Sequence, residues 1–182
     1  MKTTCKRFSY LFVGPALAVV LTVGAWADQP ISPKARERLE REVRQELVRL
    51  PFYGVFDHLA FHEDGYHVHL TGRVTRPTLI SDAEQAIKRI EGVVMVTDDI
   101  EVLPISPHDD RIRMAVFRAL FFNGPLERYG RQANPPIHII VKGGHVTLEW
   151  IVANEADKKL AGILTNHVPG LFSVTNNLRT GA

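Results

Sequence analysis

Cysteine is nearly absent from this sequence of 182 residues. The single cysteine, Cys5, lies near the start, and none follows it. Cys5 precedes the apolar stretch of the first residues, so it is not placed like the cysteine of a lipoprotein, which comes after one. Small exported domains often depend on disulfides, but a chain with one cysteine cannot form a disulfide within itself. Its folded part must be held together by packing.

Long hydrophobic runs are missing as well. The apolar stretch Leu11–Val23 is shorter than the roughly 20 residues that a membrane-spanning helix needs. It follows a basic segment and precedes Ala25-Trp26-Ala27, which offers small residues at the two positions that a signal peptidase reads. We therefore expect residues 1–27 to be a signal peptide, cleaved after Ala27, and the mature protein to be periplasmic. An uncleaved leader that anchors the chain is the alternative.

Excess charge of either sign is also lacking. The chain has 22 basic and 20 acidic residues, but Lys2, Lys6 and Arg7 belong to the leader. Residues 28–182 therefore carry 19 basic and 20 acidic side chains, and most of the basic character of the sequence is the leader's. Because a nearly neutral chain has no general attraction to polyanions, we expect no nucleic-acid partner.

Patterns typical of catalysis are scarce. The serines Ser81, Ser106 and Ser173 have no nucleophile-elbow sequence around them. Asp98-Asp99 aligns with Asn176-Asn177 when the two halves of the chain are superposed, and acids that amides can replace usually serve turns and backbone hydrogen bonds. We expect a non-enzymatic protein with no catalytic residues, no cofactor and no small-molecule substrate.

What the sequence does contain is a repeat. Residues 65–102 align with residues 143–180 without a gap, at a constant offset of 78. The preceding helices align at an offset of 69, so the second copy has about nine extra residues before its first strand. A unit of this kind used twice predicts two similar small domains, at residues 33–104 and 108–180.

Each copy has the pattern of α-β-β-α-β. Apolar residues at helical spacing follow the Ser32 cap in the first copy, and Asp109 or Asp110 is the expected cap in the second. The crossover helices should begin near Pro77 and Asn154. The sequence therefore predicts the α+β class, with two small α-β-β-α-β sandwiches. Each sandwich should have two helices on one face of a three-stranded mixed sheet.

The two hairpins have turn signals that predict their register. Asp64-Gly65 is typical of a type I′ turn in the first copy, and Gly143-Gly144 takes that place in the second. Either turn would gather the apolar side chains on one face of its hairpin, with the histidines of the first copy on the other. The expected pairs are Leu59 with Leu70 and His62 with His67, then Ile139 with Leu148, Val141 with Val146 and Ile137 with Trp150.

The strand and ending motifs of both copies resemble the BON domain (bacterial OsmY and nodulation). The pattern is Val-x-Leu-x-Gly-x-Val, a helix, then Gly-Val-x-x-Val-x-(Asn/Asp)-(Asn/Asp)-(Ile/Leu)-x-Val. Residues 68–74 and 92–102 carry it in the first copy, and residues 146–152 and 170–178 in the second, where Trp150 replaces the family's glycine. The resemblance implies an α/β sandwich and a periplasmic, non-enzymatic module that associates with phospholipid membrane or envelope partners.

Four histidines of the first copy should project from the hairpin face opposite the core: His58, His62, His67 and His69. Cross-strand imidazoles on one face are close enough to share Zn²⁺ or Ni²⁺. No carboxylate or cysteine completes a ligand set at a fixed spacing, and the second copy keeps only His145. We therefore expect a solvated or interface surface without metal, and metal binding through this face is a remote alternative.

The segment Asn123–Pro136 contains the extra residues of the second copy. It holds Leu126 and Tyr129 among Arg128 and Arg131. Aromatic and apolar side chains beside arginine suit a membrane interface, because guanidinium groups meet lipid phosphates there. These four residues are the predicted lipid-binding site. Alternatively, the segment is a packed loop whose apolar residues complete the core.

The expected function is that of a binding module, with an anionic phospholipid surface or an envelope assembly as partner. A soluble protein-interaction or scaffold module without lipid affinity is the competing class, because the nearly neutral mature chain has no general attraction to anionic lipid.

Overall fold

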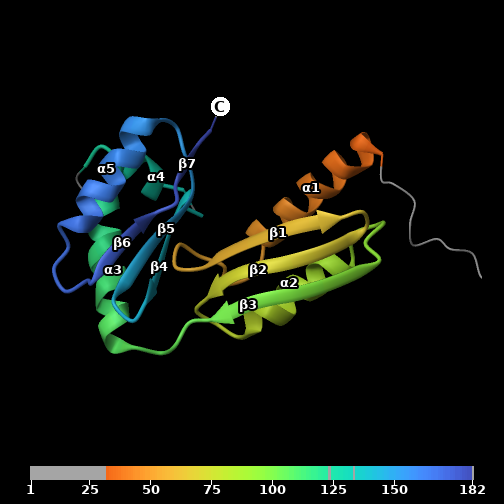
Figure 1. Cartoon of the computed structure of the whole chain (residues 1–182), viewed down its shortest axis with the longest axis horizontal. Coiled ribbons are helices and arrows are strands. Elements are labelled where there is room, and N and C mark those ends of the chain that lie inside the picture. The colour runs from red at the N-terminus through yellow and green to blue at the C-terminus, as the bar shows by residue number, and fades with distance from the viewer. Residues whose placement is uncertain (1–31, 123, 133, 182) are drawn as a thin grey trace, which may run out of the picture.

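The structure is a computed structural model that describes residues 32–122, 124–132 and 134–181. The predicted signal peptide, residues 1–27, lies outside the described residues. Within the described ranges, no helix has the length and apolar character needed to cross a membrane. The chain forms two domains, each built in the order α-β-β-α-β that the repeat predicts (Figure 1).

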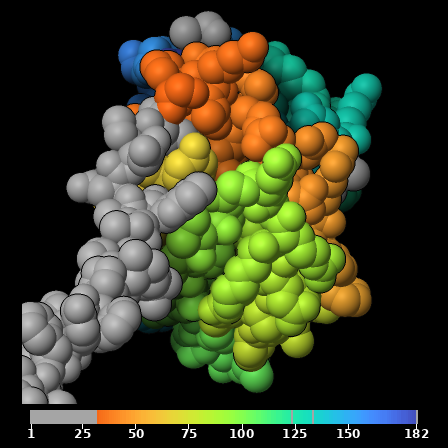
Figure 2. All heavy atoms as spheres, turned by 90° about the vertical axis from the view of Figure 1, so that its right-hand side faces the viewer, coloured from red at the N-terminus to blue at the C-terminus, as the bar shows by residue number. Residues whose placement is uncertain are grey.

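The first domain is a three-stranded mixed sheet covered by two helices. Its elements are α1 (Pro33–Val48), β1 (His58–Asp64), β2 (His67–Val74), α2 (Thr78–Lys88) and β3 (Met95–Val102). In the sheet order β1-β2-β3, β1 is antiparallel to β2 and β2 is parallel to β3. The helices α1 and α2 contact each other over one face of this sheet, and Figure 2 shows their orange and yellow-green surfaces beside each other. The predicted architecture is confirmed.

The second domain repeats this plan with two additions. Its elements are α3 (Pro107–Phe121), α4 (Glu127–Gly130), β4 (Ile137–Lys142), β5 (His145–Val152), α5 (Glu155–Asn166), β6 (Ser173–Asn176) and β7 (Arg179–Thr180). The short helix α4 is formed by the extra residues of the second copy. The third strand is divided, because β6 and β7 both pair in parallel with β5 but at different places along it.

Two of the helices start at the capping side chains that the sequence predicted, and a third does not. The side chains of Ser32 and Asn154 each accept a backbone N–H three residues on, at 3.3 and 2.9 Å. For α3 the expected cap, Asp109 or Asp110, is wrong. Ser106 Oγ accepts the Asp109 N–H at 3.2 Å, so α3 begins with the same Ser-Pro pair as α1. The carboxylate of Asp109 therefore does not cap α3 and can bind other groups.

The register of the first hairpin differs from the expected one. Asp64 pairs with His67, so the turn is Gly65-Tyr66, and Leu59 lies opposite Gly72 instead of Leu70. The predicted pairing was therefore wrong by two residues. Because side chains alternate with a period of two, this slip leaves every residue on its predicted face.

The register of the second hairpin is confirmed. Ile139 pairs with Leu148, and the Gly143-Gly144 turn lies where the sequence placed it. Gly65-Tyr66 and Gly143-Gly144 occupy the same position at the repeat offset of 78, so the two copies have the same turn.

Each domain has a core between its helices and one face of its sheet. The first core includes Leu39, Val43, Leu47, Leu59, Leu70, Leu79, Ala83 and Ile87. The second includes Ile112, Val116, Leu120, Leu126, Ile137, Ile139, Leu148 and Leu178. Val55 and Phe56, from the loop between α1 and β1, also pack against the second core. The first domain therefore contributes side chains to the interior of the second, and the two are joined by more than their linker.

Candidate functional site at the domain junction

The edge strand of the second sheet is covered by a segment of the first domain. Ile139 on β4 donates its backbone N–H to the carbonyl oxygen of Val55 at 2.7 Å. The adjacent His138 hydrogen-bonds through Nδ1 to the carbonyl oxygen of Asp57. An open sheet edge leaves backbone groups unpaired, and here the chain pairs one edge with its own α1–β1 loop.

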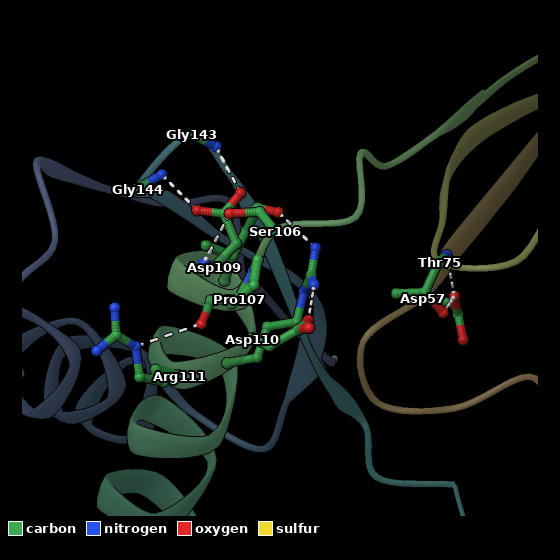
Figure 3. Close-up of polar contacts among 11 residues, drawn as sticks. Asp57, Thr75, Ser106, Pro107, Asp109, Asp110, Arg111, Gly143 and Gly144 are labelled. Carbon is green, nitrogen blue, oxygen red and sulfur yellow. Dashed lines mark hydrogen bonds and ion pairs between the residues drawn. The ribbon is translucent and has the colours of Figure 1, made fainter.

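The carboxylate of Asp57 holds that loop in shape. It is 3% exposed and accepts the Gly54 N–H at 3.1 Å, the Thr75 N–H at 2.6 Å and the Thr75 hydroxyl at 2.8 Å. Figure 3 shows Asp57 and Thr75 meeting at the end of the first sheet. Because the carboxylate joins the loop to the end of β2, the carbonyl groups that meet β4 have a fixed position.

Asp109 does the same for the hairpin of the second sheet. Its carboxylate is buried and accepts the N–H groups of Gly143 and Gly144, both at 2.8 Å (Figure 3). The turn between β4 and β5 is therefore attached to the first turn of α3. This attachment orients the sheet that receives the first domain.

Aromatic rings from both domains fill the junction. The ring of His138 lies 5.2 Å from that of Trp150, 5.4 Å from that of Tyr53 and 6.0 Å from that of His58, measured between centroids. The ring of His58 is also 6.0 Å from that of Trp150 and nearly perpendicular to it. Such tilted and edge-to-face contacts are the favoured geometries of ring pairs.

Trp150 occupies its place at a cost in backbone strain. Its φ angle is +100°, a region that residues with a side chain rarely adopt. The equivalent Gly72 has φ of +139°, and a Cβ there would lie 2.1 Å from the carbonyl oxygen of His58. Strain of this kind persists where the surroundings fix it and is concentrated at functional sites. Trp150 is therefore the most unusual residue of the junction.

Burial keeps both junction imidazoles neutral. Desolvation lowers the pKa of His138 to about 4, and the neighbouring His58 lowers it further. The pKa of His58 is also lowered to about 4 by burial, with contributions from the charges of Arg179 and Arg73. Burial raises the pKa of the Tyr53 hydroxyl. The junction is therefore an uncharged aromatic cluster at neutral pH.

A groove opens from this cluster along the first domain. We call it the junction groove; it has a volume of about 600 Å³. The lining comes from three places: a stripe of α1, which we call the side of the groove; β1, which we call its floor; and residues of β5, β7 and the loop before β7, which we call its inner end. Its lining consists of Arg36, Glu40, Arg44, Leu47, His58–Glu63, Glu149, Trp150, Asn177 and Arg179.

The lining of the junction groove is chemically mixed. It combines charged side chains of both signs with an indole ring and a strand edge.

The family model of the BON domain matches this chain twice, over residues 35–104 and 108–182. The chain belongs to the BON domain family. No curated protein matches it. Two similar solved structures are of CdsD, a structural protein of the type III secretion system of Chlamydia trachomatis. The C-terminal domain of CdsD is 10% identical, with 79% of this chain and 98% of that chain covered and a TM-score of 0.31.

The second CdsD structure is 13% identical, with 79% and 93% of the two chains covered and a TM-score of 0.28. At these identities and scores, neither likeness bears on the function of the tandem BON protein.

The four residues predicted to bind lipid lie in and beside α4. Leu126 is 0% exposed and Tyr129 is 7% exposed. The Tyr129 hydroxyl donates to the carboxylate of Asp157 at 2.6 Å. Arg128 forms an ion pair with the same carboxylate, and Arg131 reaches the surface. Of the four, only the two arginines are placed to meet a membrane. Lipid contact by this segment stays a prediction.

The hydrogen bond from Tyr129 and the charge of Arg128 hold the pKa of Asp157 below its usual value. This carboxylate joins the inserted segment to the start of α5. The extra residues of this BON copy therefore contribute to its own core and polar contacts.

The four histidines of the first BON copy do not gather at one place. His62 lies opposite His69 in the hairpin, and His69 Nε2 lies 3.1 Å from a carboxylate oxygen of Asp99. His58 is instead part of the junction cluster, where its Nδ1 is buried without a hydrogen-bond partner among the described residues. In the part of the chain that the structure describes, no group of three or more His, Cys, Asp or Glu side chains could hold a metal ion.

Sequence reasoning missed most of the junction residues. Asp57 and His138 were not singled out, and Trp150 was noted only as a departure from the family pattern. One signal was available. Ile139 and Ile140 are consecutive and therefore face opposite sides of β4, and both are buried. A strand that is apolar on both faces predicts a second packing partner, which is the first BON domain.

Proposed function

We propose that this protein is a non-enzymatic binding module of the cell envelope, exported to the periplasm, and that the junction groove is its docking site. The observation that carries the proposal is the strained Trp150, held at φ of +100° at the inner end of a groove that both BON copies line. A single copy would have only part of this groove, which gives the tandem arrangement a role.

A partner protein suits this site better than a membrane surface. The groove lies between a helix and a strand edge, where a flat bilayer has no access to the floor. Its lining carries three arginines and three glutamates, so it has no net attraction to anionic headgroups. An envelope assembly is therefore the partner class that we favour.

Site-specific photo-crosslinking in cells that make the full chain tests this proposal. A photoreactive residue at Ala60, in the groove, should give protein adducts. The same residue at Ile163, which is exposed on α5 and is not part of the groove lining, serves as the matched control. Loss of the Ala60 adduct in an Arg36→Glu, Arg179→Glu variant would locate the partner in the groove. Equal adducts at both positions, or only phospholipid adducts at Ala60, would overturn the proposal.

Contact with anionic phospholipid through the inserted segment is a second candidate. Arg131, with a side chain that is 76% exposed, and the neighbouring Arg128 favour it. Arginines close to an anionic surface add to membrane affinity, so reversing both charges should weaken liposome binding roughly tenfold or more. Co-sedimentation of residues 28–182 with phosphatidylglycerol vesicles at low and high salt, for the wild type and for Arg128→Glu, Arg131→Glu, measures this. No sedimentation of the wild type removes the candidate.

A further inference from the structure

We propose that the free edge of β1 takes up an extended segment of a partner protein, which adds to the first sheet as a fourth strand along the floor of the junction groove. The inference rests on the proposed function and specifies how the partner would bind. It is carried by the backbone of β1, by the way the second copy uses the same edge, and by the dimensions and charges of the groove.

The outer edge of β1 has unused backbone groups. In the order β1-β2-β3, β1 is a terminal strand. Leu59 donates its N–H to the Tyr53 hydroxyl at 3.4 Å, away from β2. Because antiparallel strands alternate the direction of their backbone groups, Phe61 and Glu63 also direct their N–H and C=O groups outward. Among the described residues, neither takes part in a backbone hydrogen bond outside the regular elements.

The second copy shows the same edge in use. Phe61 corresponds to Ile139 at the repeat offset of 78. The N–H of Ile139 points outward from β4 and is paired with the carbonyl oxygen of Val55 at 2.7 Å. The fold therefore accepts an extended backbone at this position in one copy and leaves the equivalent position of the other copy open. Long, open strand edges are usually protected in proteins, and β1 has seven residues with no proline.

The groove has the length of a short strand. Its helical side runs along α1 from Arg36 to Leu47. At about 1.5 Å of rise per residue, this is about 16 Å. An extended chain covers about 3.3 Å per residue, so about five residues of a partner fit beside β1. The volume of about 600 Å³ is within the usual range for binding sites.

The charges of the groove suggest which side chains such a segment carries. Arg44 is paired with Glu40 at 2.8 Å. Arg36 and Arg179, at the two ends, form no ion pair among the described residues. Arg179 shares its end with Trp150. We therefore expect an extended segment with small β-branched residues along the edge of β1 and a carboxylate where it passes Arg179.

A synthetic peptide tests this directly. The probe has seven residues, alternating valine and threonine with a glutamate at each end, and is added to ¹⁵N-labelled residues 28–182. The backbone amide signals of Phe61 and Glu63 should move downfield, and this movement should reach saturation as the probe is added. A probe that is N-methylated on the amides facing β1 should not bind. N-methylation on the opposite amides, the matched control, should leave binding intact. A probe with lysine ends should bind at least threefold more weakly.

Two variants of the protein separate the backbone from the side chain at Glu63. Glu63→Pro removes an N–H that faces away from β2, so the sheet ladder remains intact, and binding of the probe should fall at least fivefold. Glu63→Ala removes the same side chain and keeps the N–H, so it measures the effect of the side chain alone, and the proline variant should bind the probe at least fivefold more weakly than the alanine variant. A spectrum of Glu63→Pro that retains the β2 and β3 signals confirms that the variant is folded.

The outcomes distinguish this inference from the proposed function. Shifts confined to the Trp150 indole and the arginines, with the β1 amides unmoved, would overturn strand addition and leave the groove as a docking site. Equal binding of the two N-methylated probes would overturn it as well. No shift at any residue with millimolar probe would also overturn strand addition by a segment of this kind, while the crosslinks from Ala60 decide independently whether a protein occupies the groove.

Discussion

Acidification should loosen the domain junction between pH 7.5 and 5.5. His138 and His58 are held neutral, with pKa values lowered from 6.5 to about 4. In the unfolded chain both imidazoles bind protons as the pH falls through 6.5, whereas in the folded protein they do so only near pH 4. The unfolded state therefore binds more protons in this range, and stability must fall as the pH falls.

The magnitude follows from the two pKa values. For His138, which is 2% exposed, the difference between 6.5 and about 4 corresponds to a total loss of about 3 kcal/mol, complete below pH 4. Between pH 7.5 and pH 5.5, each such histidine should lower the free energy of unfolding by about 1 kcal/mol. His58 acts in the same direction. Together they should lower the free energy of unfolding by about 2 kcal/mol at pH 5.5.

Other groups near the imidazoles do not change charge in this range. Arg73 and Arg179 stay cationic, and the raised pKa of Tyr53 keeps its hydroxyl neutral. The lowered pKa of Asp157 means that its contribution is lost only as the pH falls below 3.8. The pH range between 7.5 and 5.5 therefore reports mainly on histidine.

Urea unfolding followed by the fluorescence of Trp150 measures the effect. Trp150 is the only tryptophan in residues 28–182, so its emission reports on the junction itself. The control is the double variant His58→Gln, His138→Asn, whose amide nitrogen at position 138 takes the place of Nδ1 and can still donate to the Asp57 carbonyl. Its unfolding free energy should change by less than half as much as that of the wild type. An equal loss of unfolding free energy in the wild type and the double variant would refute the assignment of the pH effect to these two imidazoles.

Two further predictions concern backbone geometry. Asp109→Ala removes the charged acceptor of the Gly143 N–H on the exposed side of the turn and of the buried Gly144 N–H. We expect the free energy of unfolding in urea to fall by about 2–4 kcal/mol; a loss below 1 kcal/mol would show that the turn does not need this carboxylate. At position 150, Trp150→Gly should be more stable than Trp150→Ala by about 1 kcal/mol in thermal unfolding, because glycine adopts φ of +100° without strain. Alanine is normally the more stable of the two, and that order here would contradict the strain.

The repeat made most of the fold predictable. The sequence shows the order α-β-β-α-β twice, and the apolar faces of corresponding helices and strands agree between the copies. Few alternative folds were therefore left for either domain. The first hairpin failed for a specific reason. Turns at Asp64-Gly65 and at Gly65-Tyr66 differ by two residues in register and bury the same faces, so the hydrophobic pattern could not separate them. The repeat offset, which aligns Gly65-Tyr66 with Gly143-Gly144, favours the observed turn.

The site was much less predictable, because it depends on contacts between distant residues. His138 meets the Asp57 carbonyl across 81 positions of the chain, and no local pattern reports such a pairing. The inserted segment shows the same difficulty. Leu126 and Tyr129 could have faced solvent or core, and the decision depends on Asp157, which accepts the Tyr129 hydroxyl from 28 residues away.

One difference between the two copies lies where they meet, and it explains the shape of the site. In the first copy Gly72 lets the start of β1 pass close to β2, which a side chain would prevent. In the second copy Trp150 takes that position, and the third strand is divided into β6 and β7 at the corresponding point. The ring that disturbs the second sheet packs on the histidines of the junction and also ends the groove beside β1. Packing between the copies and access to the free strand edge therefore depend on the same residue.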